Sequence, residues 1–125
     1  MDLHTINSQL EAAYQEQAKA AKIIYNELEA EAANIQEKIK KLVLVKDLTA
    51  SQSALTKEAV ERCNDITDLL QTAKNNYYTT VSTGYAGCFK DSATSYYLLL
   101  DNYQCLTAYI NNENKLLNQI TGAAS

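Results

Sequence analysis

Residues 3–46 read LHTINSQLEAAYQEQAKAAKIIYNELEAEAANIQEKIKKLVLVK, and no proline occurs there or elsewhere in the 125 residues. Apolar residues recur at steps of mostly three or four, which places them on one face of an α-helix. They are Leu3, Ile6, Leu10, Ala13, Ala20, Ile24, Leu28, Ala32, Ile35, Ile39 and Leu42. Lysines gather near the end of the stretch, where a helix C-terminus favours cations. This pattern predicts a helix over about residues 3–46.

Residues 47–53 are rich in side chains that cap helices. Thr49 and Gln52 have the spacing of a capping box, and Ser51 and Ser53 are alternative N-caps. A second helix is predicted over about residues 54–82. Its apolar face consists of Leu55, Ala59, Cys63, Ile66, Leu70, Ala73, Tyr77 and Val81.

Gly84 and Gly87 form the strongest break in the chain, because glycine adopts left-handed backbone angles at low cost. We expect a turn near Gly84, then Asp91 or Ser92 as the cap of a third helix over about residues 92–121. Its seam contains Tyr96, Leu99, Tyr103, Leu106, Ile110, Leu117 and Ile120, and Gly122 ends it. In the alternative, the second helix continues through both glycines at a cost of about 1 kcal/mol each relative to alanine.

The predicted fold is a single all-α domain over residues 1–125. It is either an antiparallel three-helix bundle or an elongated helical hairpin with coiled-coil-like packing. At 13.9 kDa the chain suffices for one compact core.

The three cysteines leave two interpretations open. If the chain folds back at Gly84, Cys63 and Cys105 are equidistant from the turn, and a disulfide could join them; otherwise they are buried free thiols. Cys88 is then a free or intermolecular thiol. A bridge would indicate an extracellular protein, whereas free thiols would indicate a cytoplasmic one. The start of the chain does not resemble a secretory signal, so we expect either an intracellular protein or a mature sequence with a new initiator Met.

Charge and composition exclude several functions. The net charge of −4 argues against nucleic acid, which is bound by clustered Lys and Arg. The apolar run from Leu42 to Val45 is too short to cross a bilayer, and we expect the lysines of residues 38–46 to complete a helix end rather than rest on a membrane.

We predict that the protein is not an enzyme and holds no cofactor or metal. Its cysteines lack metal-site spacing, and the single histidine, His4, stands at the far end of the chain from them. No catalytic, cofactor-binding or metal residue is therefore predicted.

The predicted helices differ in length. The first spans roughly 65 Å at 1.5 Å per residue, and the other two cover only about 30 residues each, which leaves Leu3, Ile6, Leu10 and Ala13 without a partner in their own chain. Most of the nine tyrosines lie in the C-terminal half. We expect Tyr77, Tyr96, Tyr103 and Tyr109 on the seam, and Tyr78, Tyr85 and Tyr97 beside it, where exposed rings suit a protein interface.

These features predict a non-enzymatic helical interaction or structural module. It would self-associate as a homo-oligomer or bind another helical protein through the N-terminal stripe and the exposed tyrosines. The alternative is a small secreted bundle, stabilised by a disulfide, that carries a small apolar ligand between its helices.

Overall fold

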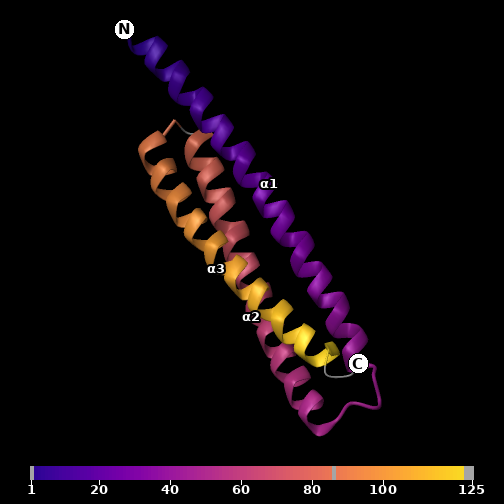
Figure 1. The fold of residues 1–125 in the computed structure, drawn as a ribbon. Helices are drawn as coiled ribbons and strands as arrows, with labels where there is room; N and C mark the ends of the chain where they lie inside the picture. The colour runs from indigo at the N-terminus through magenta and orange to yellow at the C-terminus, as the bar shows by residue number, and fades with distance from the viewer. Residues whose placement is uncertain (1, 86, 123–125) are drawn as a thin grey trace.

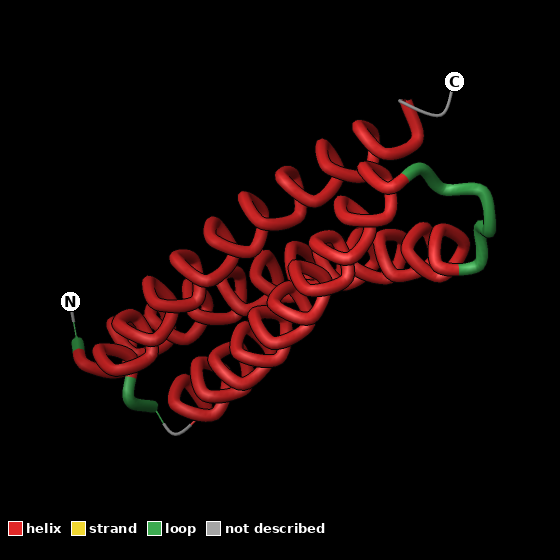
Figure 2. Tube along the Cα trace, turned by 90° about the horizontal axis from the view of Figure 1, so that it is seen from below, coloured by secondary structure: helices red, strands yellow, loops and turns green. Residues whose placement is uncertain are grey.

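A computed structural model describes residues 2–85 and 87–122, except for the side chains of residues 7, 85, 89 and 92. Three helices make up nearly all of this part: α1 (Leu3–Val43), α2 (Ala50–Tyr85) and α3 (Phe89–Gly122). They lie side by side and run alternately up and down (Figures 1 and 2). The described part contains no strand, and the predicted all-α class is confirmed.

The first helix begins and ends at identifiable caps. Asp2 is the N-cap, and its Oδ1 accepts a hydrogen bond from the Thr5 backbone N–H at 2.8 Å. At the other end, the N–H groups of Leu44 and Val45 bond to carbonyls three residues back, which tightens the chain out of the α-helix. The helix therefore ends at Val43, three residues before the predicted end.

The predicted capping box starts α2. The Thr49 side chain accepts from the Gln52 N–H at 3.1 Å, and the Gln52 side chain accepts from the Thr49 N–H at 2.9 Å. The helix thus begins at Ala50, four residues earlier than predicted. Gln52 is buried, and its Nε2 also donates to the carbonyl of Ile120 at 3.2 Å, which ties the start of α2 to the end of α3.

The second turn lies at Gly87 rather than near Gly84. Gly87 has φ 78°, its N–H bonds to the Gly84 carbonyl, and the Cys88 N–H bonds to the Thr83 carbonyl. These two bonds form a Schellman motif, which requires a left-handed residue after the helix. The second helix therefore passes through one glycine and stops before the other, and Asp91 lies in the first turn of α3 instead of capping it.

Gly84 has a packing role inside α2. A Cβ atom built at this position would overlap the aromatic ring of Tyr14. The Tyr14 hydroxyl donates to the carbonyl of Val81 at 2.7 Å, so the ring lies directly across the end of α2. A residue with no side chain is needed here because α1 crosses too closely for any other.

The core lies along the line where the three helices meet, and α2 and α3 share the most extensive interface. The Tyr103 hydroxyl on α3 donates to the Ala21 carbonyl on α1 at 2.8 Å, so the third helix is held against the first as well. The largest fully buried apolar side chains are Ile35, Ile66, Leu99, Leu106, Ile110 and Ile120.

Candidate functional site

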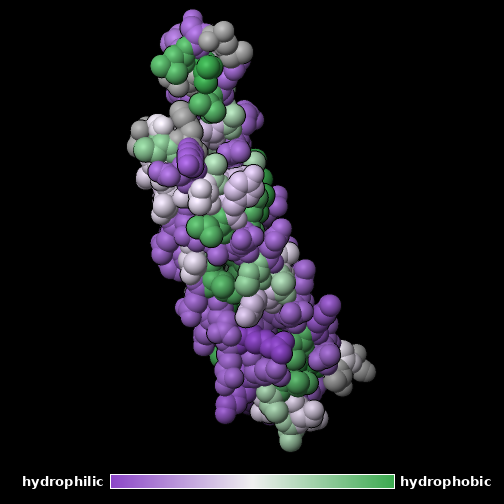
Figure 3. Space-filling model, turned by 90° about the vertical axis from the view of Figure 1, so that its left-hand side faces the viewer, coloured by the Kyte–Doolittle hydropathy of each residue, from purple (hydrophilic) through white to green (hydrophobic). Residues whose placement is uncertain are grey.

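The N-terminal end of α1 extends past the turn between α2 and α3 (Figure 1). Tyr14 is the first buried residue of α1, and every earlier residue whose burial the structure describes is exposed. Leu3 is 72% exposed, Ile6 38% and Leu10 43%, and Ala13 is exposed as well. We call residues 3–13 the overhang and these four apolar side chains the overhang stripe. In Figure 3, green hydrophobic atoms gather at this tip of the molecule.

The overhang stripe does not continue the seam that α1 uses inside the bundle. That seam advances by alternate steps of four and three residues, and all its members are buried or half-buried. They are Tyr14, Ala18, Ala21, Tyr25, Leu28, Ala32, Ile35, Ile39 and Leu42. The same steps taken backwards from Tyr14 reach three polar positions: Glu11, Asn7 and His4.

Each member of the overhang stripe precedes a seam position by one residue. One residue is about 100° around an α-helix, so the stripe occupies a separate face. Further along α1, the same face carries Ala20 and the half-buried Ile24, which packs against the core. It turns polar beyond them, where Glu27 and Glu31 line a groove together with Asn114 and Asn118 of α3. The face is therefore apolar in the overhang and at the start of the bundle, and polar toward the other end of α1.

The tyrosines divide between the core and the surface. Tyr103 is buried, Tyr77 and Tyr96 are half-buried, and Tyr109 is 41% exposed, so the prediction that Tyr109 lines the seam is wrong. Tyr77 stacks on Tyr25 with ring centroids 6.4 Å apart.

The predicted interface tyrosines are only partly described. Tyr78 and Tyr97 are exposed, on α2 and α3 respectively, as predicted. Tyr85, the third of them, has a side chain outside the described residues. Tyr14, which the sequence did not single out, is the aromatic residue that closes the bundle against the overhang.

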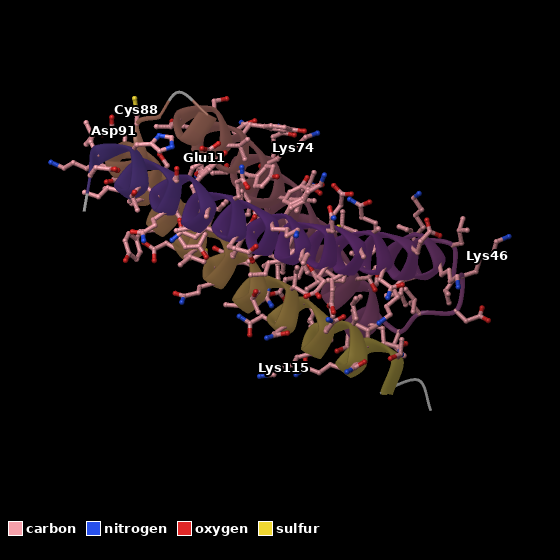
Figure 4. All side chains as sticks on the ribbon, turned by 90° about the horizontal axis from the view of Figure 1, so that it is seen from above. Glu11, Lys46, Lys74, Cys88, Asp91 and Lys115 are labelled. Atoms are coloured by element: carbon pink, nitrogen blue, oxygen red, sulfur yellow. The ribbon has the colours of Figure 1, made fainter. Side chains whose placement is uncertain are left out.

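The structure does not bring Cys63 and Cys105 together. Both are free thiols; Cys63 is buried, whereas Cys105 is exposed. The turn lies about three residues later than predicted, which slides α3 along α2 by about six residues, or about 9 Å. Cys105 also directly precedes the buried Leu106, so it faces away from the seam. Cys88 is a free, exposed thiol at the end of the molecule that carries the overhang (Figure 4).

A buried carboxyl group lies in the α2–α3 interface. Glu113 is fully buried, and neither of its side-chain oxygens has a hydrogen-bond partner. Burial raises its pKa to about 7; Arg62 lowers that pKa, and Glu58 and Asp65 raise it. Arg62 binds Glu58 at 2.7 Å and does not pair with Glu113. Burial and the nearby Glu113 charge also raise the pKa of the Cys63 thiol.

Sequence reasoning missed Glu113, although a signal was present. The predicted seam of α3 stepped from Ile110 to Leu117 and left a gap of seven residues. The regular step of three from Ile110 falls on Glu113. A charged residue at a seam position is a candidate for a group with a shifted pKa.

The opposite end of the molecule carries an apolar groove between α1 and α3. Leu42, Val45 and Leu117 line it, Lys38 and Lys41 flank it, and its volume is about 280 Å³.

Within residues 2–85 and 87–122, the structure shows no group of three or more His, Cys, Asp or Glu side chains placed to hold a metal ion. None of the helices in that part is both long and apolar enough to cross a membrane.

Comparisons with protein-family models, curated proteins and solved structures find no match to this chain.

Proposed function

We propose that this protein is a non-enzymatic helical interaction module whose overhang stripe binds an apolar face of another helix. The observation that carries the proposal is the placement of the stripe. It is exposed, it extends beyond the chain's own bundle, and it lies on a face that the α1 seam does not use. An apolar face of this kind on a polar surface marks an interaction site.

The overhang is prepared for binding because it is already helical. An isolated helix as short as residues 3–13 would be marginal in water. Here it continues a helix that is packed from Tyr14 onward, and the Asp2 cap holds its first turn. Little conformational entropy is therefore lost when the stripe meets a partner, which favours affinity.

The free energy available from burying the stripe favours a reversible interaction. Complete burial of one Leu or Ile side chain contributes about 1.5–3 kcal/mol. Association costs about 4–15 kcal/mol in lost freedom of motion. Burial of three such side chains and one alanine offsets only part of this cost, or exceeds it by a small margin. The stripe thus supports weak binding by itself, and exposed rings such as Tyr78 and Tyr97 would strengthen it only if the partner reached them.

The direct test is site-specific photo-crosslinking in the native cellular or secreted environment of the protein. A benzophenone amino acid at Leu10 on the stripe should form an adduct with a helical polypeptide, which mass spectrometry identifies. The same probe at Ser8, on the opposite face of the overhang, is the matched control. The proposal is wrong if Leu10 gives no adduct, or none beyond those that Ser8 gives.

A second candidate function is the transport of an apolar ligand, which the groove at Leu42, Val45 and Leu117 favours. Its 280 Å³ would hold a short apolar chain, and Lys38 and Lys41 would suit an anionic head group. The free thiols remove the disulfide from this hypothesis. Native mass spectrometry of protein purified from its source should show a bound ligand, and Val45→Glu, at an exposed position of the groove, should abolish it. A ligand-free native mass would count against transport.

A further inference from the structure

We infer that the partner of the overhang stripe is the overhang stripe of a second copy of this chain, packed antiparallel about a two-fold axis. This inference rests on the proposed function, since it names the helix that the stripe binds. Three features of the overhang carry it: the spacing of the stripe, its sequence of large and small side chains, and its length.

The spacing of the stripe is the same from either end. Leu3, Ile6, Leu10 and Ala13 are separated by steps of three, four and three residues. When two copies lie antiparallel, Leu3 therefore meets Ala13 of the second copy, and Ile6 meets Leu10 of the second copy. A two-fold interface requires this kind of self-matching surface.

The side-chain sizes favour the antiparallel direction over the parallel one. Antiparallel packing places the large Leu3 against the small Ala13 at both ends and two large side chains at each central contact. Parallel packing would place Leu3 on Leu3 and Ala13 on Ala13, which crowds one end and leaves a gap at the other. Even filling is favourable because interfaces, like cores, lose contacts at voids.

The length of the overhang fits one overhang of a second copy. It extends about 16 Å, at 1.5 Å per residue, before α1 enters the bundle at Tyr14. In the antiparallel pair, the second copy's helix begins at Leu3, beside Ala13 of the first. Each overhang is thus covered along its whole length, and the two α1 helices extend away from the pair in opposite directions.

Charges lie away from the centre of this pair. Gln9 flanks the stripe and approaches Gln9 of the second copy near the two-fold axis, so no like charges meet there. At the outer edges Asp2 approaches Glu16 of the second copy. Because these like charges repel, salt should strengthen the pair, which is the reverse of its effect on opposite charges.

The interface is small. Two overhangs bury less surface than the roughly 1,200–2,000 Å² of a stable complex. We therefore expect a concentration-dependent dimer with a dissociation constant in the micromolar range or weaker.

Disulfide trapping in the full-length chain tests the arrangement. The background carries Cys88→Ser and Cys105→Ser, because both thiols are exposed, and keeps the buried Cys63. In this background Gln9→Cys should form a covalent dimer under mild oxidation, with a yield that rises with protein concentration. Ser8→Cys, on the opposite face, should not, and adding Ile6→Glu to Gln9→Cys should reduce the yield at least tenfold.

A mixing experiment determines the direction. Isotopically labelled Leu3→Cys chains mixed with unlabelled Ala13→Cys chains should give mainly the mixed covalent dimer, measured by intact mass. Circular dichroism checks that every variant keeps the helical content of the wild type. Mainly Leu3→Cys homodimers would establish a parallel pair and overturn the inference.

Sedimentation velocity of the wild type completes the test. We expect a fraction of dimer that rises with protein concentration and with salt. Ile6→Glu should raise the dissociation constant of the dimer at least tenfold. A wild type that stays monomeric at high concentration overturns the inference, as does equal trapping by Gln9→Cys and Ser8→Cys. If the Leu10 photoprobe then captures a different helical protein, the proposed function stands and only the second copy is excluded; if it captures nothing, both fail.

Discussion

The overhang stripe and Glu113 are opposite exceptions to the usual distribution of side chains. The stripe places apolar side chains in water, and Glu113 places an unpaired carboxyl group in the core. Exposed apolar atoms are common and cost a single chain little, whereas a buried charge without a partner costs several kcal/mol.

The unfavourable surroundings of these two groups can be relieved in different ways. Another polypeptide can cover the stripe, because it lies beyond the turn of its own bundle. Glu113 is buried in its own chain, and burial raises its pKa to about 7, so the carboxyl group takes up a proton and becomes neutral below that pH. The stripe therefore points to intermolecular binding, and Glu113 to a stability that depends on pH.

The largest expected difference in the free energy of unfolding is between two leucines that are each replaced by alanine. Leu106→Ala, in the core, should lower the free energy of unfolding by about 2–5 kcal/mol, because it leaves a cavity. Leu10→Ala, in the overhang, should change it by about 0.5 kcal/mol or less. Urea denaturation at low protein concentration measures both. A large loss for Leu10→Ala would mean that the stripe stabilises its own chain.

Glu113 should make the protein less stable as pH rises from 4.5 to 7. An unfolded Glu loses its proton near pH 4.5, whereas the folded protein holds it up to about pH 7. The folded state binds more protons over this window, so the free energy of unfolding falls by about 3 kcal/mol and then stays level.

Glu113→Gln isolates this effect, since the amide does not titrate. Urea denaturation between pH 4.5 and 8 should measure the free energy of unfolding of both proteins. Relative to Glu113→Gln, the wild type should be about 3 kcal/mol more stable at pH 4.5 than it is at pH 8. A difference that does not vary with pH would show that Glu113 is ionised in the folded state as readily as in the unfolded one.

The boundary between overhang and bundle should be sensitive at Gly84. Gly84→Ala places a methyl group against the Tyr14 ring and should cost about 1–3 kcal/mol of stability. Gly122→Ala is the matched control, because a Cβ atom there meets nothing within 4 Å, and it should change stability by about 0.5 kcal/mol or less. Thermal denaturation compares the two. Equal melting temperatures would mean that α1 crosses α2 less closely than the structure shows.

The smallest expected difference is between two helix caps. Thr49→Ala removes half of the capping box at the start of α2 and should lower the free energy of unfolding by about 1 kcal/mol. Asp2→Ala should have almost no effect on global unfolding, because it frays an overhang that the bundle does not need. Instead it should speed amide hydrogen exchange in residues 3–6. If both variants lost the same stability, the overhang would belong to the cooperative unit.

Much of the fold follows from local patterns. The periodicity of α1, the Thr49–Gln52 capping box and the punctuation at the two glycines predict three helices, although the boundaries differ by up to four residues. Such signals are local, so one chain segment is enough to evaluate them.

The pairing of residues between helices was less predictable. The choice between Gly84 and Gly87 as the turn shifts every contact between α2 and α3, and it separates Cys63 from Cys105. Periodicity alone did not decide it, because Gly84 is explained by the crossing of Tyr14, which is seventy residues away in the sequence.

The sequence by itself determined the helical class, the absence of proline breaks and the excess length of α1, because these depend on composition and local spacing. Only the tertiary structure decided that Glu113 is buried without a partner, that Cys105 faces solvent and that Tyr14 marks where the overhang begins. These facts depend on the rotation and register of one helix against another. A shift of one residue turns a helix face by about 100°, a difference that a pattern read along one segment does not resolve.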